Sequence, residues 1–375
     1  MTDTTDDPNR DESADGTDCL LVASTADATG KTALAISLAQ LASDRGEQVG
    51  YMKPKGTRLE SSVGKTRDED PLLAREVLGL DAEMHDLEPI VYSPTFIENA
   101  IRGREDPDAL CERVREAFDR LADGRDRMLI EGGGHLDLGG VVELTDPEVA
   151  DLLDARVLLV AAYTGTDDID AVLAAADVVG DRLQGVLFNA VQSGGGESLR
   201  TDVIPFLEGR DIPVHGVIPY ERELGGVRIR DLAAELGAEV LVEDGLDAYV
   251  ERFSVGAMGA DSALGQFRRL TDAVVVTGGD RPELHIGALE APGVSCLLVT
   301  GGHRPPGAVL GRATERAVPV LSVTTDTLTA VERAESIVRT GRARDERSVE
   351  RMRSLLETHA DIEAVFDGTH ETRQD

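Results

Sequence analysis

One stretch near the N-terminus constrains the fold of this chain most. It is an apolar run followed by a short polar stretch and a Gly-Lys-Thr triplet. Residues 19–24 are Cys-Leu-Leu-Val-Ala-Ser, residues 25–29 are small or polar, and Gly30, Lys31 and Thr32 open a segment of helix-forming residues. This order predicts a strand, a phosphate-binding loop and a helix. Loop N–H groups and the positive helix end bind phosphate, the lysine neutralises outer phosphates and the threonine hydroxyl ligates Mg²⁺.

The match departs from the strict pattern, because Thr25 stands where a glycine is usual. An accidental Gly-Lys-Thr in an ordinary turn is the alternative. Lysine usage favours phosphate binding, since the chain has 38 Lys and Arg residues but only four lysines, all between residues 31 and 65. Lysine binds phosphate as a point charge. The predicted nucleotide-binding residues are Thr25, Asp27, Ala28, Thr29, Gly30, Lys31 and Thr32.

Composition limits the classes of function. The formal net charge is −33, with 71 acidic residues spread along the chain, which predicts a halophilic protein adapted to a salt-rich cytoplasm. No basic face is visible, so we expect no nucleic-acid binding. No apolar run has membrane-spanning length, so we expect no membrane association. The three cysteines have no metal-ligand spacing, and Cys19 and Cys296 are expected in the core.

Alternating strand and helix patterns predict an α/β fold with two domains. We expect a doubly wound, mostly parallel sheet in a P-loop NTPase domain at 18–222 and a second, smaller α/β domain at 223–345. Residues 1–17 are expected to form a disordered acidic tail, and 346–375 a C-terminal helix with a polar tail.

Polar residues follow several predicted strands, where ligands of parallel sheets bind. Lys53 follows the strand predicted at 47–51 and would lie near the phosphate loop if that strand neighbours the first. Glu131 follows an apolar strand and is typical of a second Mg²⁺-linked acid. The acidic turn at 66–71 has the alternative explanation of a favourable helix start.

A Gly-Gly pair after each of two later strands marks the second domain. Thr277 and Thr300 each end a predicted strand and precede two glycines. Glycine pairs let backbone approach a ligand, whereas tight turns without a ligand are the alternative. The residues predicted to contact a small effector are Thr277, Gly278, Gly279, Asp280 and Arg281.

Several of these stretches together resemble the dethiobiotin synthetase family. Residues 24–32 resemble its phosphate loop, which also carries threonine at this point, and residues 51–56 resemble its Lys-Pro segment. The resemblance implies ATP and Mg²⁺ as cofactors, Thr32, Asp70 and Glu131 as metal-binding residues, and Asn189 as the adenine-reading residue. Lys53 matches the lysine that contacts the carboxylated substrate. Ala28 stands where many members carry an acid.

The second domain resembles the DRTGG type, although its residues run Thr-Gly-Gly-Asp-Arg. The pairing of domains, over roughly 18–345, is similar to the N-terminal region of long phosphotransacetylases. It implies a nucleotide-sensing module that acts with a separate acetyl-CoA or acetate enzyme, in a homo-oligomer, without acetyltransferase activity of its own. Whether the chain is itself an enzyme stays open.

Two other functions compete with the sensor. One is an ATP-dependent carboxylate-activating ligase of the dethiobiotin synthetase type, with Lys53 holding the acid. The other is a cobyrinate-type amidotransferase. Cys296 lies mid-strand without the Gly-x-Cys-x-Gly pattern that a nucleophile on a tight elbow needs, which disfavours the amidotransferase.

Overall fold

The computed structural model describes residues 16–57, 59–62, 65–192, 194–256, 260–340 and 346–367. The chain divides into two compact units. The first comprises residues 1–189, 194–218 and 352–375, and the second comprises 190–193 and 219–351. Most of the acidic tail expected at 1–17 lies outside the described residues. Within it, the Thr17 hydroxyl donates a 2.9 Å hydrogen bond to the Arg125 carbonyl.

The first unit is built on a six-stranded sheet in the order β10-β9-β8-β1-β7-β2. In chain order its strands are β1 (Asp18–Ser24), β2 (Val49–Met52), β7 (Arg127–Glu131), β8 (Arg156–Ala162), β9 (Leu183–Val191) and β10 (Val214–Pro219). The pairs β2–β7, β7–β1, β1–β8 and β8–β9 are parallel. The doubly wound, mostly parallel sheet is therefore confirmed.

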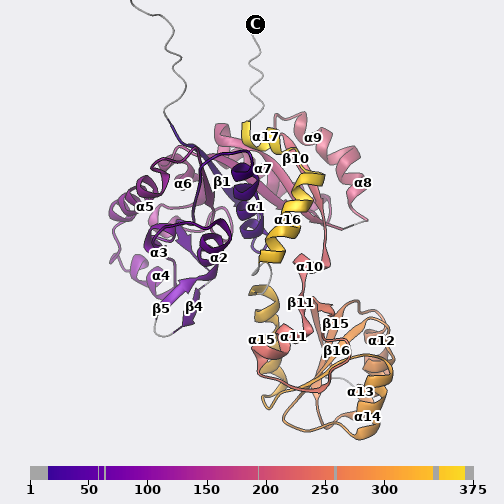
Figure 1. Cartoon of the computed structure of the whole chain (residues 1–375). Coiled ribbons are helices and arrows are strands. Elements are labelled where there is room, and N and C mark those ends of the chain that lie inside the picture. The colour runs from indigo at the N-terminus through magenta and orange to yellow at the C-terminus, as the bar shows by residue number, and fades with distance from the viewer. Residues whose placement is uncertain are drawn as a thin grey trace, which may run out of the picture. The chain divides into compact units, whose positions relative to one another are not determined.

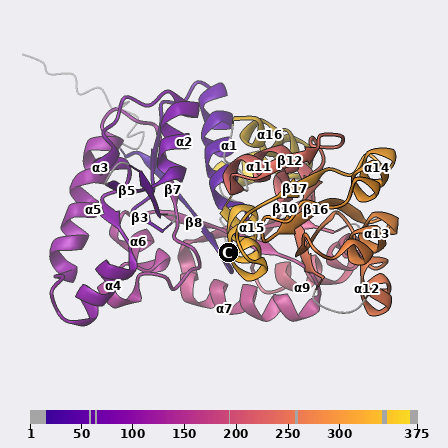
Figure 2. The same ribbon diagram turned by 90° about the horizontal axis from the view of Figure 1, so that it is seen from below.

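Helices cover both faces of this sheet, and in Figure 2 α1 and α7 lie on opposite sides of the strands. The helices of this region are α1 (Lys31–Asp44), α2 (Glu69–Leu78), α3 (Met84–Leu87), α4 (Pro94–Ile101), α5 (Pro107–Ala122), α6 (Asp146–Leu152), α7 (Ile169–Val179), α8 (Gly196–Ser198) and α9 (Ile204–Glu208). Residues 157–161 of β8 are buried, because a parallel strand covered on both faces needs a continuous apolar run.

Two short pairs of strands lie outside the main sheet. They are β3 (Lys55–Gly56) with β6 (Ile90–Val91), and β4 (Leu59–Ser62) with β5 (Lys65–Asp68). The stretch 66–71, expected as an acidic turn or as a favourable helix start, is the end of β5 followed at once by the start of α2. Asp68 caps α2 by accepting a hydrogen bond from the Asp70 N–H, which explains where the helix begins.

The second unit contains a five-stranded sheet in the order β12-β17-β16-β15-β14. Only β12 is antiparallel to its neighbour. Its strands are β12 (Glu239–Val242), β14 (Arg252–Val255), β15 (Ala273–Gly278), β16 (Val294–Thr300) and β17 (Val320–Ser322), and β11 (Val227–Arg228) pairs with β13 (Tyr249–Val250).

Alternation along the central strands produces a core on each face of this second sheet. The side chains of Val274 and Val276 join one cluster of buried residues, whereas Val275 joins another. α11 (Ile229–Leu236) and α15 (Thr327–Thr340) pack in the first cluster. α12 (Ala260–Phe267), α13 (Pro282–Glu290) and α14 (Gly307–Glu315) pack in the second. The smaller α/β domain is thus a helix–sheet–helix sandwich, preceded by α10 (Arg222–Gly225).

The C-terminal segment returns to the first unit. α16 (Glu346–His359) begins in residues of the second unit and ends in the first, and α17 (Ile362–Asp367) follows it (Figure 1). Ala360 forms an antiparallel bridge with Gly216 of β10. Phe366 is buried, and its ring lies 4.4 Å from the guanidinium carbon of Arg127. Ala360 therefore lies against β10, an edge strand of the first sheet.

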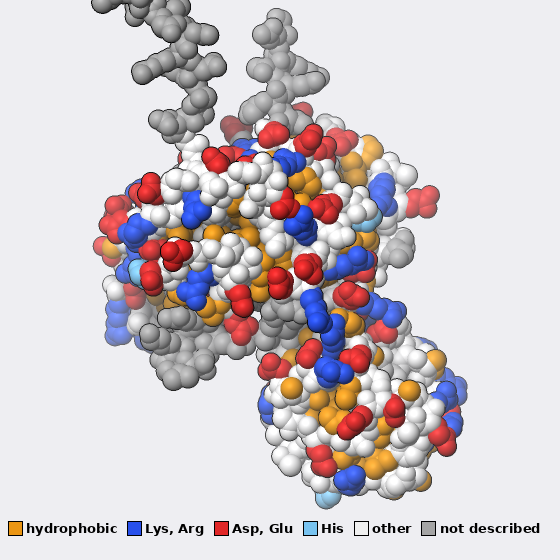
Figure 3. All heavy atoms as spheres, in the orientation of Figure 1, with side chains coloured by type: hydrophobic (Ala, Val, Ile, Leu, Met, Phe, Trp, Pro, Cys, Tyr) orange, Lys and Arg blue, Asp and Glu red, His pale blue; other side chains and the backbone are white. Residues whose placement is uncertain are grey.

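The described surface carries mixed charges rather than one large basic area. Acidic and arginine side chains are interspersed over the face that Figure 3 shows. Many arginines pair with acids, as Arg312 does with Glu290. Among the described residues, no helix has both the length and the apolar character that crossing a bilayer requires.

Candidate functional site: a phosphate loop beside a buried carboxylate cluster

The loop between β1 and α1 has the backbone that a phosphate-binding loop needs. Gly30 is the N-cap of α1 with φ +89°, a left-handed conformation that favours glycine. A Cβ atom there would lie 2.6 Å from Nδ2 of Asn189. Ala28 has φ +56°, an uncommon value for a residue with a side chain. Close approach and backbone conformation both require glycine at position 30.

Lys31 is held inside this loop. Its Nζ donates hydrogen bonds to Oγ of Ser24 at 2.6 Å and to the Gly134 carbonyl. Burial lowers the pKa of Lys31, while the nearby carboxylates of Asp146 and Glu131 favour its charged form. The predicted phosphate lysine thus lies between the end of β1 and the loop that follows β7.

Thr32 and Glu131 meet directly, as a shared metal site would need. The Thr32 hydroxyl donates a 2.7 Å hydrogen bond to Oε1 of Glu131, and Tyr51 donates one of 2.6 Å to Oε2. Burial raises the pKa of Glu131, and the Lys53 ammonium opposes that rise. Burial and Glu131 also raise the pKa of Tyr51 far above its usual range. Tyr51 was not among the predicted site residues.

Lys53 lies at the centre of three carboxylates. Its Nζ contacts Asp70, lies 2.8 Å from Asp68 and lies 3.4 Å from Glu131. Burial alone would lower the pKa of Lys53, but Asp70, Glu131 and Asp68 outweigh it and raise that pKa. Two of the predicted metal-binding acids are thereby joined to the predicted substrate lysine.

The strand before Lys53 was expected to neighbour β1, and this expectation is wrong, although Lys53 does lie in the site. Its strand, β2, pairs with β7 and not with β1. Strand β7 lies between β1 and β2. Lys53 is therefore linked to the phosphate loop by its contact with Glu131, the last residue of β7. Strand order, which local patterns do not encode, explains the difference.

The sequence analysis did not identify Asp68 as a site residue. It also did not identify a second buried ion pair, between Lys55 and Asp146. Asp68 precedes a helix, so the N-cap preference for Asp could have identified its capping role but not its contact with Lys53. Nζ of Lys55 lies 3.1 Å from Asp146 and bonds the Leu138 and Leu144 carbonyls. Asp146 in turn accepts a 2.9 Å hydrogen bond from the Gly133 N–H. These contacts hold the loop that carries the Gly134 carbonyl.

Asn189 contacts the phosphate loop itself. Its Nδ2 donates a 2.7 Å hydrogen bond to the carbonyl of Thr29. The Thr29 hydroxyl oxygen is buried and, within the described part of the chain, has no hydrogen-bond partner. Thr25 is half-buried, and Asp27 and Ala28 are exposed. The predicted nucleotide-binding residues therefore form one continuous loop with Asn189 against it.

The donor set of this site fits Mg²⁺ by its chemistry. Hydroxyl and carboxylate oxygens from Thr32, Asp70 and Glu131 are ligands that Mg²⁺ prefers. The Lys53 ammonium lies among the same carboxylates. Across residues 16–367, apart from the gaps already given, no group of three or more His, Cys, Asp or Glu side chains is arranged to hold a metal.

The Thr277 segment lies at the carboxyl end of β15 in the second unit. Arg281 donates a 2.9 Å hydrogen bond to the Gly256 carbonyl, and Nε2 of His285 lies 2.9 Å from the Gly278 carbonyl. Gly279 approaches the His303 carbonyl so closely that a Cβ atom would collide with it. Close backbone packing therefore explains this glycine, with Asp280 in the turn that follows it.

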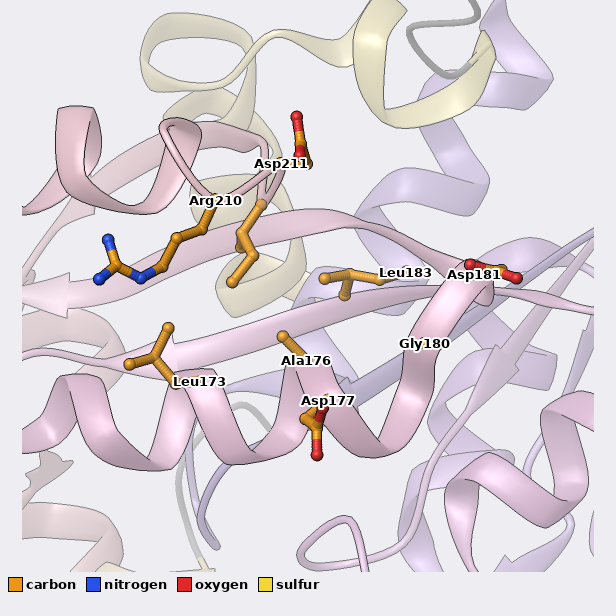
Figure 4. Close-up of a pocket in the computed structure, with 9 residues that line it drawn as sticks. Leu173, Ala176, Asp177, Gly180, Asp181, Leu183, Arg210 and Asp211 are labelled. Carbon is orange, nitrogen blue, oxygen red and sulfur yellow. The ribbon is translucent and has the colours of Figure 1, made fainter.

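A separate hollow of about 500 Å³ lies elsewhere in the first unit (Figure 4). Leu183, where β9 begins, and Asp177 of α7 line it with Arg210 and Asp211. The phosphate loop follows the carboxyl end of β1, whereas this hollow lies where β9 begins. None of the predicted site residues lines the hollow.

Two family models together match most of the chain. A family model described as an AAA domain matches residues 18–228, more than half of the chain, and a model described as a DRTGG domain matches 231–337. Phosphate acetyltransferase of Pseudomonas putida is 26% identical over 355 residues, which cover 88% of this chain and 49% of that protein. The chain thus spans about half the length of this curated relative.

Two further relatives match the first domain. ATP-dependent dethiobiotin synthetase BioD of Frankia casuarinae is 30% identical over 210 residues, covering 53% of this chain and 83% of that protein. A probable cobyric acid synthase of Methanothermobacter thermautotrophicus is 27% identical over 237 residues, covering 55% of this chain and 45% of that protein. The chain therefore belongs to the AAA-domain family through residues 18–228 and carries a DRTGG domain behind it.

Proposed function

We propose that the first domain binds ATP with Mg²⁺ and that the chain works as a nucleotide-sensing module. The observation that carries this proposal is the meeting of Lys31, Thr32 and Glu131 under one glycine-capped loop. A triphosphate on the loop N–H groups would draw the Lys31 ammonium from Ser24 and Gly134 toward its outer oxygens. Asn189, already against Thr29, is the candidate for reading adenine.

Thr32, Glu131 and Asp70 would hold the metal ion. Bound Mg²⁺ supplies charge neutralisation for the outer phosphates. Lys53 keeps three buried carboxylates close together, so their oxygens are gathered before a cation arrives. Tyr51 fixes the second oxygen of Glu131, which leaves Oε1 directed at Thr32.

The second domain would bind a small effector at the carboxyl end of its sheet. The contacts of Gly278, Gly279 and Arg281 support an ordered backbone there. The similarity to phosphate acetyltransferase supports a role in acetyl-CoA or acetate metabolism, with a separate enzyme of that class as partner. We place the protein in the cytoplasm, as a homo-oligomer, with domain boundaries near 222 and 345.

The primary test is calorimetric titration in molar KCl, because a chain with a net charge of −33 needs screening. ATP with Mg²⁺ should bind one site in the first domain more tightly than GTP. Acetyl-CoA and cyclic dinucleotides probe the second domain. Absence of ATP binding would refute the proposal, and recovery of no acetyl-CoA or acetate enzyme in co-purification would count against the partner.

A ligase of the dethiobiotin synthetase type is the second candidate, favoured by the 30% identity to BioD. In this structure Lys53 already contacts three carboxylates, so an acidic substrate would meet an arrangement with more acids than cations. This charge balance suits a cation better than a carboxylate. Release of ADP that depends on one small acid in a metabolite screen would reverse the preference.

A further inference from the structure

Helix α16 brings a methionine to the phosphate loop from a part of the chain that lies beyond both family matches. Met352 is buried, with 2% of its surface exposed. Its Cε atom lies 3.8 Å from the position that a Cβ atom on Gly30 would occupy. Asn189 and Met352 are the side chains nearest to that position. A residue 322 positions after the loop thus contacts the entrance to α1.

The residues that follow this methionine anchor it to the first unit. Next to it, Arg353 forms an ion pair with Asp44, the last residue of α1. Further along, the Asp361 N–H donates a 2.7 Å hydrogen bond to the His215 carbonyl. Arg156 bonds the Phe366 carbonyl at 2.6 Å, and Gln184 bonds the Ala364 carbonyl at 2.7 Å. The final turns of α16 are therefore a structural part of the first unit.

We propose that Met352 forms a wall of the nucleoside part of the nucleotide site, opposite Asn189. This inference rests on the nucleotide binding proposed above. Phosphates bound to the loop and to Lys31 would lie at the start of α1, so the attached nucleoside would lie near Gly30, where Asn189 and Met352 are the nearest side chains. A flexible, polarisable thioether packs well against an aromatic base.

The test separates base recognition from phosphate recognition. The full chain and its Met352→Ala variant are titrated with Mg²⁺-ATP and with Mg²⁺-tripolyphosphate, which has phosphates but no base. ATP affinity should fall about three- to tenfold in Met352→Ala, because the sulfur–aromatic contact is lost. Tripolyphosphate affinity should stay unchanged.

Leu356→Ala provides the matched control. Leu356 is fully buried on the same helix, but it is not among the atoms nearest to Gly30. It should weaken the packing of α16 and leave ATP affinity unchanged, and thermal unfolding of both variants measures that packing loss.

Three outcomes would overturn the inference about Met352. They are unchanged ATP affinity in Met352→Ala, an equal loss for ATP and tripolyphosphate, and an equal loss of ATP affinity in Leu356→Ala. Failure of the unaltered chain to bind either compound would instead refute the proposed nucleotide site itself.

Discussion

The Thr32 hydroxyl donates a 2.7 Å hydrogen bond to Oε1 of Glu131, 99 residues further along the chain. This contact joins the first turn of α1 to the end of β7, which pairs directly with β1. Because both strands end at the same edge of a parallel sheet, the two side chains converge there. The site is a product of strand order as much as of residue type.

Replacing Lys31 by alanine is expected to abolish detectable ATP binding and leave the fold intact. The lost interaction joins a charged donor to phosphate, so the affinity should fall by at least about 10- to 100-fold. Calorimetry measures the affinity, and circular dichroism checks the fold. Arg312→Ala, which breaks exposed ion pairs in the second unit, is the control. Unchanged ATP affinity in Lys31→Ala would mean that the loop does not bind phosphate.

Substitution of the metal-binding acids should remove the effect of Mg²⁺ rather than the binding of the base. In Asp70→Ala and Glu131→Ala, titrations of ATP with Mg²⁺ and with EDTA should give similar affinities, whereas the unaltered protein should bind more weakly in EDTA. Glu112→Ala, an exposed acid on α5, should keep the full Mg²⁺ effect. If both acid variants keep it too, the metal is held elsewhere.

Two substitutions of Asp68 should separate its capping role from its charge. Asp68 accepts hydrogen bonds from the N–H groups of Asp70 and Thr57, at 2.9 and 2.8 Å. Asparagine keeps one acceptor oxygen and therefore the capping bond from the Asp70 N–H, and it leaves Lys53 paired by Asp70 and Glu131. Alanine keeps neither of the two hydrogen bonds. Urea unfolding should show a loss about 1–3 kcal/mol larger for Asp68→Ala than for Asp68→Asn. Equal losses of unfolding free energy in the two variants would show that Asp68 stabilises the protein through its charge alone.

Phe366 is expected to stabilise the first unit from the C-terminal end. Its ring is buried and contacts the guanidinium groups of Arg127 and Arg45, whose carbons lie 4.4 and 4.9 Å from its centre. Phe366→Ala should lower the free energy of unfolding by about 3–5 kcal/mol, because a large buried side chain is removed. Glu363→Ala, on the exposed side of α17, should change it by less than about 0.5 kcal/mol. A similar small effect of both would show that α17 is dispensable.

The three thiols should differ in reactivity. Burial, assisted by Asp18, raises the pKa of Cys19 to about 12, and burial also raises the pKa of Cys296 far above its usual range. Cys111 is only partly buried, and its pKa is raised less. Since the thiolate is the reactive form, iodoacetamide at pH 8 should modify Cys111 first, as read by mass spectrometry. All three should react in guanidinium chloride, and early modification of Cys19 would contradict the burial.

Local patterns were sufficient for most elements because they depend on neighbours in sequence. The apolar run at 156–162 is strand β8 and the helical pattern at 229–236 is helix α11, since an apolar run and a helical period are local signals. The favourable helix start given as the alternative explanation of 66–71 agrees with the structure, where Asp68 caps α2 and Glu69 begins it. The sequence did not show that a strand, β5, ends directly before that helix.

Contacts between residues far apart in the sequence could not be predicted from local patterns. No sequence pattern places β7 between β1 and β2, or sets Lys53 among Asp68, Asp70 and Glu131. Lys55 and Asp146, which are 91 residues apart, form a buried ion pair that could not be predicted from the two residue types. Such contacts depend on how strands order themselves in the sheet, which follows from the packing of the whole chain.

The sequence by itself determined the phosphate loop, the alternation of strands and helices, and the chemistry available at strand ends, because each depends on a few adjacent residues. Tertiary structure alone decided which of those ends meet, and it returned Met352 and Phe366 to the first unit after the chain had formed the second. The physical reason is that burial and charge pairing are properties of residues brought together by packing, irrespective of their separation along the chain.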